Sequence, residues 1–106
     1  DADRMLEEIR RKFRAVEYEF SLHAVDQSIL RHITRREVEE AVANGEIIED
    51  YPTDKYGPSC LILGFTAAGR PLHLQCTHPI RQRVKIITLY EPDPSEWVDL
   101  RLRRQP

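Results

Sequence analysis

The stretch CLILGFTAAGRPLHLQCT, residues 60–77, decides the fold of this chain. It holds two runs rich in apolar residues, 60–66 and 71–77, joined by the turn-like sequence AAGR. Similar runs lie before it at EIIEDY, residues 46–51, and after it at VKIITLYE, residues 84–91. Short runs of this kind, separated by turn residues, are typical of β-strands. We therefore predict a four-stranded, mainly antiparallel sheet between residues 46 and 91.

Helical patterns precede these strands. Apolar residues recur every three or four positions in residues 5–15, 21–33 and 34–45, which is the spacing of one helix face. Ser21 is placed to cap the second of these helices, and Thr34 and Glu37 have the spacing of a capping box for the third. Helices followed by strands indicate an α+β fold. We expect the N-terminal helices to pack on one face of the sheet and to leave the other partly open.

The chain is long enough for one hydrophobic core and too short for two. We therefore expect residues 1–106 to form a single domain, with residues 1–4 frayed at its start and residues 101–106 frayed at its end. Trp97 is expected to pack against the body of the domain. Cys60 and Cys76 lack the spacing of a metal-ligand pair, which predicts buried, reduced thiols. Because the histidines are also scattered, we expect no metal site.

Composition and charge narrow the classes of partner. Apolar residues make up 41% of the chain and charged residues 32%, the balance of an ordinary globular protein. The longest apolar runs are far below the roughly 18 residues of a membrane helix, so we expect no membrane partner and a cytoplasmic location. The net charge of -2 hides a segment, residues 55–90, with basic residues and no acidic one. Such a segment fits either an anionic partner or a solvated sheet face.

The stretch SLHAVDQSILRHI, residues 21–33, has two different faces when it is wound as a helix. Three apolar residues form a stripe that we expect to be buried: Leu22, Val25 and Ile29. Three polar residues recur every four positions on another face: His23, Gln27 and Arg31. This second row predicts one wall of a binding site.

The predicted strand 71–77 supplies another part of the same site. Alternation along it points His73, Gln75 and Thr77 to one face. If the following turn sets Gln75 opposite Lys85, then Arg83, Lys85 and Ile87 join that face, although a slip of one residue would turn Lys85 away. Cations with amide, hydroxyl and imidazole groups favour a phosphate backbone. The residues predicted to bind RNA phosphates are Gln27, Gln75, Arg81, Arg83 and Lys85.

Six short segments occur in an order that resembles an uncharacterised bacterial family of domains of unknown function, of the DUF4258 type. They are residues 20–24, 31–33, 45–49, 61–64, 71–74 and 86–90. That family is in turn distantly similar to the RelE/ParE and BrnT-like toxins, in which helices pack on a small antiparallel sheet. The resemblance implies a RelE-like fold. It also implies a toxin that cleaves RNA or blocks translation at the ribosome, neutralised by a small antitoxin protein of zinc-ribbon type.

Metal-independent RNA cleavage uses the 2′-hydroxyl of the RNA as nucleophile, so the protein needs groups that move protons and a positive charge beside the phosphate. The residues predicted to act in catalysis are His23 and His73 as acid or base, Arg31 as a phosphate clamp, and Tyr90 as a stacking or proton-donating group. No cofactor is expected. One departure stands out, because the family commonly has an arginine where this chain has Gln27, and glutamine does not neutralise a phosphate.

Two other function classes remain open. A module that binds RNA or protein on the open sheet face without chemistry is favoured by Gln27. A protein-interaction domain would instead use an exposed edge at strand 46–51. Single residues have structural alternatives as well. These alternatives are a hydrogen bond from His23 to a strand end, an ion pair of Arg31 with Asp26 or Glu49, and a core position for Tyr90.

Overall fold

The structure is a computed structural model and describes residues 1–105, so Pro106 of the predicted frayed tail lies outside the described residues. The helices are α1 (Ala2–Arg14), α2 (Leu22–Leu30) and α3 (Arg35–Ala43). The strands are β1 (Tyr18–Phe20), β2 (Glu46–Tyr51), β3 (Ser59–Phe65), β4 (Pro71–Thr77), β5 (Val84–Tyr90), β6 (Trp97–Val98) and β7 (Leu102–Arg103). The predicted α+β class is confirmed.

The main sheet has the strand order β1-β5-β4-β3-β2. β2 to β5 pair antiparallel in sequence order, as the four runs of apolar residues predict. β1 adds a fifth strand, parallel to β5, in which Tyr18 lies opposite Val84 and Phe20 opposite Ile86. The prediction of four strands missed β1 because a three-residue strand is too short to show the two-residue alternation of a sheet.

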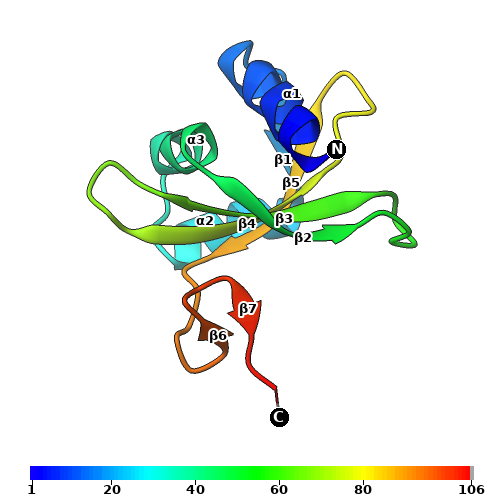
Figure 1. The fold of residues 1–106 in the computed structure, drawn as a ribbon. Coiled ribbons are helices and arrows are strands. Elements are labelled where there is room, and N and C mark those ends of the chain that lie inside the picture. The colour runs from blue at the N-terminus through cyan, green and yellow to red at the C-terminus, as the bar shows by residue number, and fades with distance from the viewer. Residues whose placement is uncertain (106) are drawn as a thin grey trace.

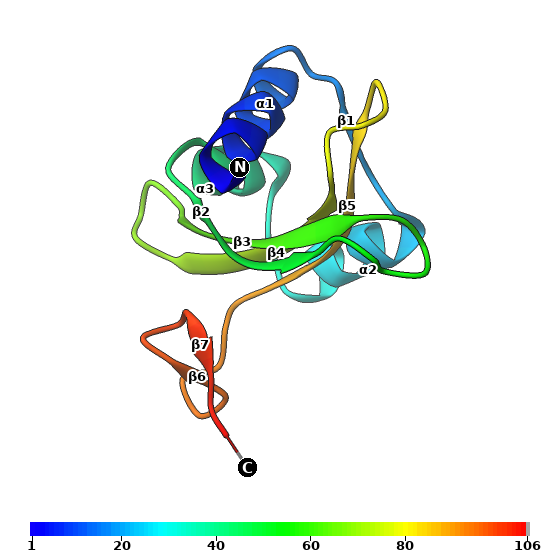
Figure 2. The ribbon, with the colours of Figure 1, turned by 45° about the vertical axis from the view of Figure 1, so that its right-hand side comes forward.

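The helices cover both faces of the sheet. Figures 1 and 2 show α1 and α3 on one side and α2 on the other, next to β5. The prediction that the N-terminal helices share one face is therefore wrong for α2. The main core lies under α1 and α3, where the buried residues include Leu6, Ile9, Phe13, Val38, Ala41, Val42, Ile62, Leu72, Leu74 and Leu89. Cys60 and Cys76 lie opposite each other in this core and are free and buried, as predicted.

The caps of α2 and α3 form as the sequence predicts. The Thr34 hydroxyl accepts from the Glu37 N–H at 3.1 Å, and the Glu37 carboxylate accepts from the Thr34 N–H at 2.9 Å. The Ser21 hydroxyl accepts from the Ala24 N–H at 3.0 Å. These three bonds satisfy N–H groups that a helix start would otherwise leave without partners.

The orientation of α2 differs from the prediction. Leu22, Val25 and Ile29 are exposed, and Ala24 is the buried residue of the helix. The reason is the tether at its start, because the Ser21 N–H donates to the Ile86 carbonyl at 2.9 Å and its hydroxyl donates to the Ile87 carbonyl at 2.9 Å. These two hydrogen bonds to β5 fix the rotation of the helix and turn Ala24 toward the sheet.

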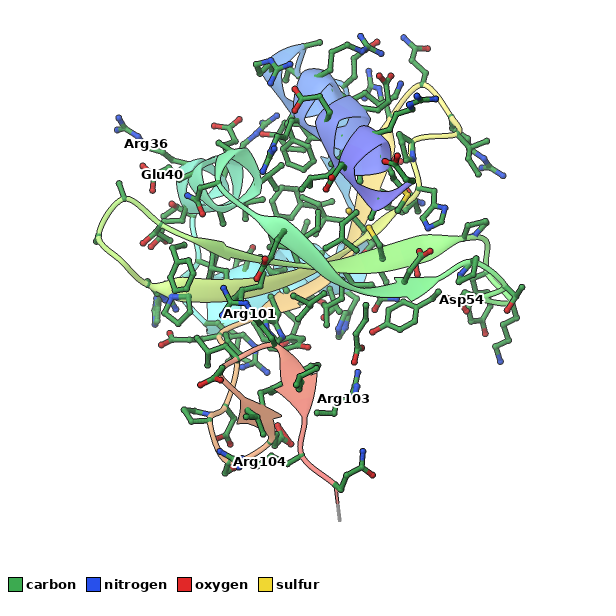
Figure 3. The ribbon with its side chains drawn as sticks, in the orientation of Figure 1. Arg36, Glu40, Asp54, Arg101, Arg103 and Arg104 are labelled. Atoms are coloured by element: carbon green, nitrogen blue, oxygen red, sulfur yellow. The ribbon has the colours of Figure 1, made fainter. Side chains whose placement is uncertain are left out.

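Secondary structure extends into both segments for which fraying is predicted, within the described residues. Asp1 caps α1 by accepting the Arg4 N–H at 2.8 Å, so the helix begins at Ala2. At the other end β6 and β7 form a hairpin that packs Trp97 against the sheet, as predicted for Trp97. Arg101 and Arg103 project from this hairpin toward the sheet, where they pair with Glu46 and Glu49 of β2 (Figure 3).

Candidate functional site

The sheet face turned away from α1 and α3 carries polar side chains, and we call it the outer face. Because Leu72, Leu74 and Cys76 are buried in the main core, the alternating residues of β4 point outward. The outer face is formed by His73, Gln75 and Thr77 of β4 and by Lys85, Thr88 and Tyr90 of β5. α2 lies over its β5 side, and the β6–β7 hairpin lies beneath the sheet (Figures 1 and 2).

A β-bulge in β5 decides which side chains join this face. The predicted pairing of Gln75 with Lys85 is wrong: Gln75 lies opposite Thr88, and Cys76 lies opposite Ile86. The extra residue between these pairs, Ile87, reverses the alternation after it. Thr88 therefore turns outward. Tyr90 also joins the outer face for this reason, and a sequence without a visible bulge could not show it.

His23 and Arg31 reach the outer face from α2. The His23 Nε2 lies 3.2 Å from the Thr88 hydroxyl, within hydrogen-bonding distance, while the residue stays exposed. The Arg31 Nε donates to the Gln27 side-chain carbonyl at 2.8 Å, so the amide orients the guanidinium. Among residues 1–105 Arg31 makes no ion pair, and the alternative of a bond to Asp26 or Glu49 is wrong.

The end of α2 is held by Arg70 from the β3–β4 turn. Its guanidinium donates to the carbonyls of Arg31 and His32, each at 2.9 Å, and to the Glu91 carboxylate at 2.9 Å. These bonds connect the end of the helix to the ends of β4 and β5. Arg70, which no motif in the sequence marks, therefore positions the Arg31 side of the site.

His73 does not reach the surface of the outer face. Its side chain is fully buried, with the Nε2 within 2.7 Å of the Leu100 carbonyl and the Nδ1 within 3.2 Å of the Tyr90 hydroxyl. Burial lowers the pKa of His73, although the Leu100 carbonyl and Glu49 act in the opposite direction. The prediction that His73 serves as a second acid or base at the site is not supported by this geometry, because no substrate can contact the ring.

Tyr90 is half-buried between His73 and the α2 side of the face. Burial raises the pKa of Tyr90, Glu49 and Glu96 add to this effect, and Arg103 and Arg31 oppose it. The hydroxyl therefore keeps its proton at neutral pH. The alternative of a core position for Tyr90 is partly right, since the residue is half-buried.

The remaining predicted phosphate-binding residues lie away from α2. Gln75 is half-buried and donates to the Ser59 hydroxyl at 3.1 Å. The Lys85 Nζ lies 3.9 Å from the Glu19 carboxylate of β1. Arg81 and Arg83 are exposed just before β5 and have no ion pair within the described chain. Lys85 and Tyr90 are five residues apart on one strand, so roughly 16 Å separates the two ends of the face.

An open hollow of about 590 Å³ lies beside Gln75. Its lining residues are Asp50, Tyr51, Pro52, Thr53, Asp54, Gln75 and Arg103. Two carboxylates at its wall disfavour a phosphate there. No three His, Cys, Asp or Glu side chains gather as metal ligands would in residues 1–105, and no helix of this part is long and apolar enough to cross a membrane.

One comparison with known proteins gives a match to part of this chain. A family model with the description Domain of unknown function (DUF4258) matches residues 20–91. The matched segment contains α2, α3 and the strands β2 to β5, together with His23, Arg31 and the whole outer face. α1 and the β6–β7 hairpin lie outside it. No curated protein and no solved structure matches the chain.

Proposed function

This chain belongs to the DUF4258 family of domains of unknown function, and from the geometry of its site we propose that it is a toxin that cleaves RNA. The RNA lies along the outer face of β5, from α2 to the loop before the strand. The same proposal includes a relationship to RelE-like toxins and action at the ribosome. It also includes a small antitoxin of zinc-ribbon type as the partner.

The observation that carries this proposal is the position of His23 and Arg31 on one side of α2. His23 contacts Thr88, and Arg31 is a cation without an acidic partner in the described chain. Arg70 donates to both the Arg31 carbonyl and the carboxylate of Glu91, the residue after Tyr90, which holds the end of α2 beside the end of β5. A proton-transfer group and a free cation on one side of a helix are groups that phosphodiester cleavage requires.

The reaction is a transfer within the RNA. Neutral His23 takes the proton of the 2′-hydroxyl, and the 2′-oxygen attacks phosphorus as the bond to the 5′-oxygen breaks. Arg31 stabilises the charge that builds up on the phosphate oxygens. The leaving 5′-oxygen takes a proton from water, and the products carry a 2′,3′-cyclic phosphate and a 5′-hydroxyl.

We would test cleavage with mixed-sequence RNA in the presence of a chelator, mapping the new ends. The parent protein should cleave the RNA, and His23→Ala should lower the rate about 10²-fold or more, the usual contribution of a general acid or base. Arg31→Ala should also lower it. The matched control is Arg36→Ala, since Arg36 lies on α3 and points away from the sheet (Figure 3). RNA left intact by the parent, with and without ribosomes, would contradict the proposal.

A second candidate is RNA binding without cleavage. The burial of His73 favours it, because His23 is then the single accessible imidazole on the outer face of the described structure. Within residues 1–105, a second imidazole that could act as the acid is missing from that face. In this case the face positions a phosphate backbone through Arg31, Gln27 and the hydroxyl of Thr88.

Binding of a labelled, uncleaved RNA at several salt concentrations separates the two candidates. The affinity should fall as salt rises, and Arg31→Ala should reduce the slope by roughly one phosphate contact. Salt-dependent binding without new RNA ends would favour the second candidate. An affinity that Arg31→Ala leaves unchanged would exclude the outer face as the RNA site.

A further inference from the structure

The side of α2 that faces away from β5 carries a contiguous apolar surface. Four side chains form it, and we call them the α2 stripe: Leu22, Val25, Ile29 and Leu30. Their exposed fractions are 86%, 39%, 69% and 70%. Residues three and four positions apart on a helix are neighbours, so Leu22, Val25 and Ile29 lie next to one another, and Leu30 continues the surface on the other side of Asp26.

This arrangement reverses the usual orientation of a helix on a sheet. The side of α2 that contacts the domain carries Ala24, with Gln27 and Ser28 half-buried beside it. Single exposed apolar residues are common on protein surfaces, but a contiguous apolar surface usually marks a binding site. The tether of Ser21 to β5 holds the helix in this rotation, so the stripe cannot turn inward without breaking two hydrogen bonds.

Asp26 indicates what covers the stripe. It lies four residues after Leu22 and four before Leu30, so its carboxylate lies between these two leucines, with Ile29 on one side and His23 on the other. Asp26 is exposed and makes no ion pair or side-chain hydrogen bond within the described residues. An occupant that buries the stripe must also supply a cation, because an unpaired carboxylate in an apolar interface is costly.

A second copy of this chain fits the stripe poorly. In a symmetric dimer with antiparallel α2 helices, the centre of the nine-residue helix lies at Asp26, and the two Asp26 carboxylates would meet. A membrane surface fits poorly for a similar reason, since it offers no fixed cation to Asp26 within the apolar layer.

We propose that the α2 stripe is the docking site for an amphipathic helix of a partner protein. The apolar residues of that helix, spaced at three and four positions, pack on Leu22, Val25, Ile29 and Leu30, and one lysine or arginine pairs with Asp26. α2 is about 13 Å long, so two to three turns of the partner cover it. This docking site is separate from the proposed RNA face, because it uses neither His23 nor Arg31.

The test is a selection of helical peptides from a fully randomised display library on the intact protein. Peptides that bind the parent should bind Ile29→Glu at least about tenfold more weakly. The matched control is Ile80→Glu, because Ile80 is also an exposed isoleucine, at 73%, but lies in the loop before β5; binding to this variant should be unchanged. Circular dichroism of each variant verifies that the fold is kept.

The charge is tested separately. The selected peptides should share a lysine or arginine between apolar positions, and its change to glutamate should weaken binding about tenfold. Asp26→Lys should restore binding of the glutamate peptide. The proposal would be overturned if the selected peptides bound Ile29→Glu as tightly as the parent, or if they shared no lysine or arginine. A dimer of the parent chain in sedimentation that Ile29→Glu dissociates would also overturn it, as would binding to lipid vesicles that the same change abolishes.

Discussion

The ring of His73, a residue of β4, packs against the indole of Trp97, with ring centroids 4.5 Å apart in an edge-to-face arrangement. The neutral ring satisfies both of its neighbours when Nε2–H donates to the Leu100 carbonyl and Nδ1 accepts from the Tyr90 hydroxyl. A buried imidazole with both nitrogens bonded stabilises the fold, and protonation would place a charge in a site that excludes water.

The stability of the protein should therefore depend on pH through His73. Burial lowers its pKa below the usual 6.5, so in acid the unfolded chain binds a proton before the folded one does. The free energy of unfolding should fall as the pH drops from about 6.5 toward the pKa of folded His73. Urea unfolding at about pH 7 and about pH 5.5 should show this fall in the parent and a smaller one in His73→Gln.

Tyr90→Phe is the control for this measurement, because it removes the hydroxyl that contacts His73 and keeps the buried imidazole. It should lower the free energy of unfolding at both pH values. The decrease in that free energy from the higher to the lower pH should remain as in the parent. Equal pH dependence in the parent and in His73→Gln would show that His73 does not titrate with unfolding.

Alternation along PLHLQCT predicted the direction of His73 correctly, on the face opposite Leu72 and Leu74. It could not predict the burial of the ring, because Trp97 and Leu100, which cover it, follow a separate segment of the chain. Local periodicity shows the direction of a side chain, whereas its exposure depends on contacts distant in sequence.

Between elements, α3 packs closely on β3. A Cβ atom on Gly64 would lie 1.9 Å from the Ala41 carbonyl oxygen. Ala41 is itself fully buried, so neither backbone can move without disturbing the core. The small residues at these two positions allow the helix to lie directly on the strand.

Gly64→Ala should accordingly destabilise the protein by about 3 kcal/mol, at the upper end of the usual cost of overpacking. Gly69→Ala is the matched control. Gly69 lies in the β3–β4 turn with φ +87° and nothing within 4 Å of an added Cβ, so only backbone strain of about 1 kcal/mol is expected there. Urea unfolding measures both values. Equal losses would mean that α3 moves away from β3 at little cost.

The elements themselves were predictable to different degrees. The capping box of α3 and the four longer strands carry strong local signals, and both are confirmed. The pattern in residues 21–33 correctly showed that α2 has an apolar and a polar side. It could not show which side faces the sheet, because Ser21 sets the rotation through bonds to Ile86 and Ile87 of a distant strand.

At the scale of the whole molecule, the β6–β7 hairpin is a separate cover on the outer face. Arg103 donates to both carboxylate oxygens of Glu49, at 2.9 and 3.1 Å, and its guanidinium lies 4.7 Å from the centre of the Trp97 ring. The basic sequence RLRR is typical of a solvated tail, so the expected fraying was reasonable from composition. Its acidic partners lie on β2, the edge strand of the sheet, and only the folded chain brings them together.

Arg103→Ala should loosen this cover without unfolding the sheet. Trp97 is the single tryptophan of the chain, so quenching of its fluorescence by acrylamide reports on the hairpin alone. Quenching should rise in Arg103→Ala, while the free energy of global unfolding falls by about 1 kcal/mol or less, as for a partly exposed ion pair. Arg104→Ala is the matched control, because Arg104 donates to the Pro94 carbonyl and has no ion pair within the described residues.

Salt distinguishes the ion pair from the packing of Trp97 on His73. If Arg103 and Glu49 hold the hairpin, quenching in the parent should rise with ionic strength, because salt screens a partly exposed pair. The Arg103→Ala protein should then show high quenching that salt no longer changes. Equal quenching in the parent and in Arg103→Ala would mean that the contact between Trp97 and His73 holds the hairpin against the sheet instead. This is the alternative because Trp97 is 4% exposed and packs on the fully buried His73 ring.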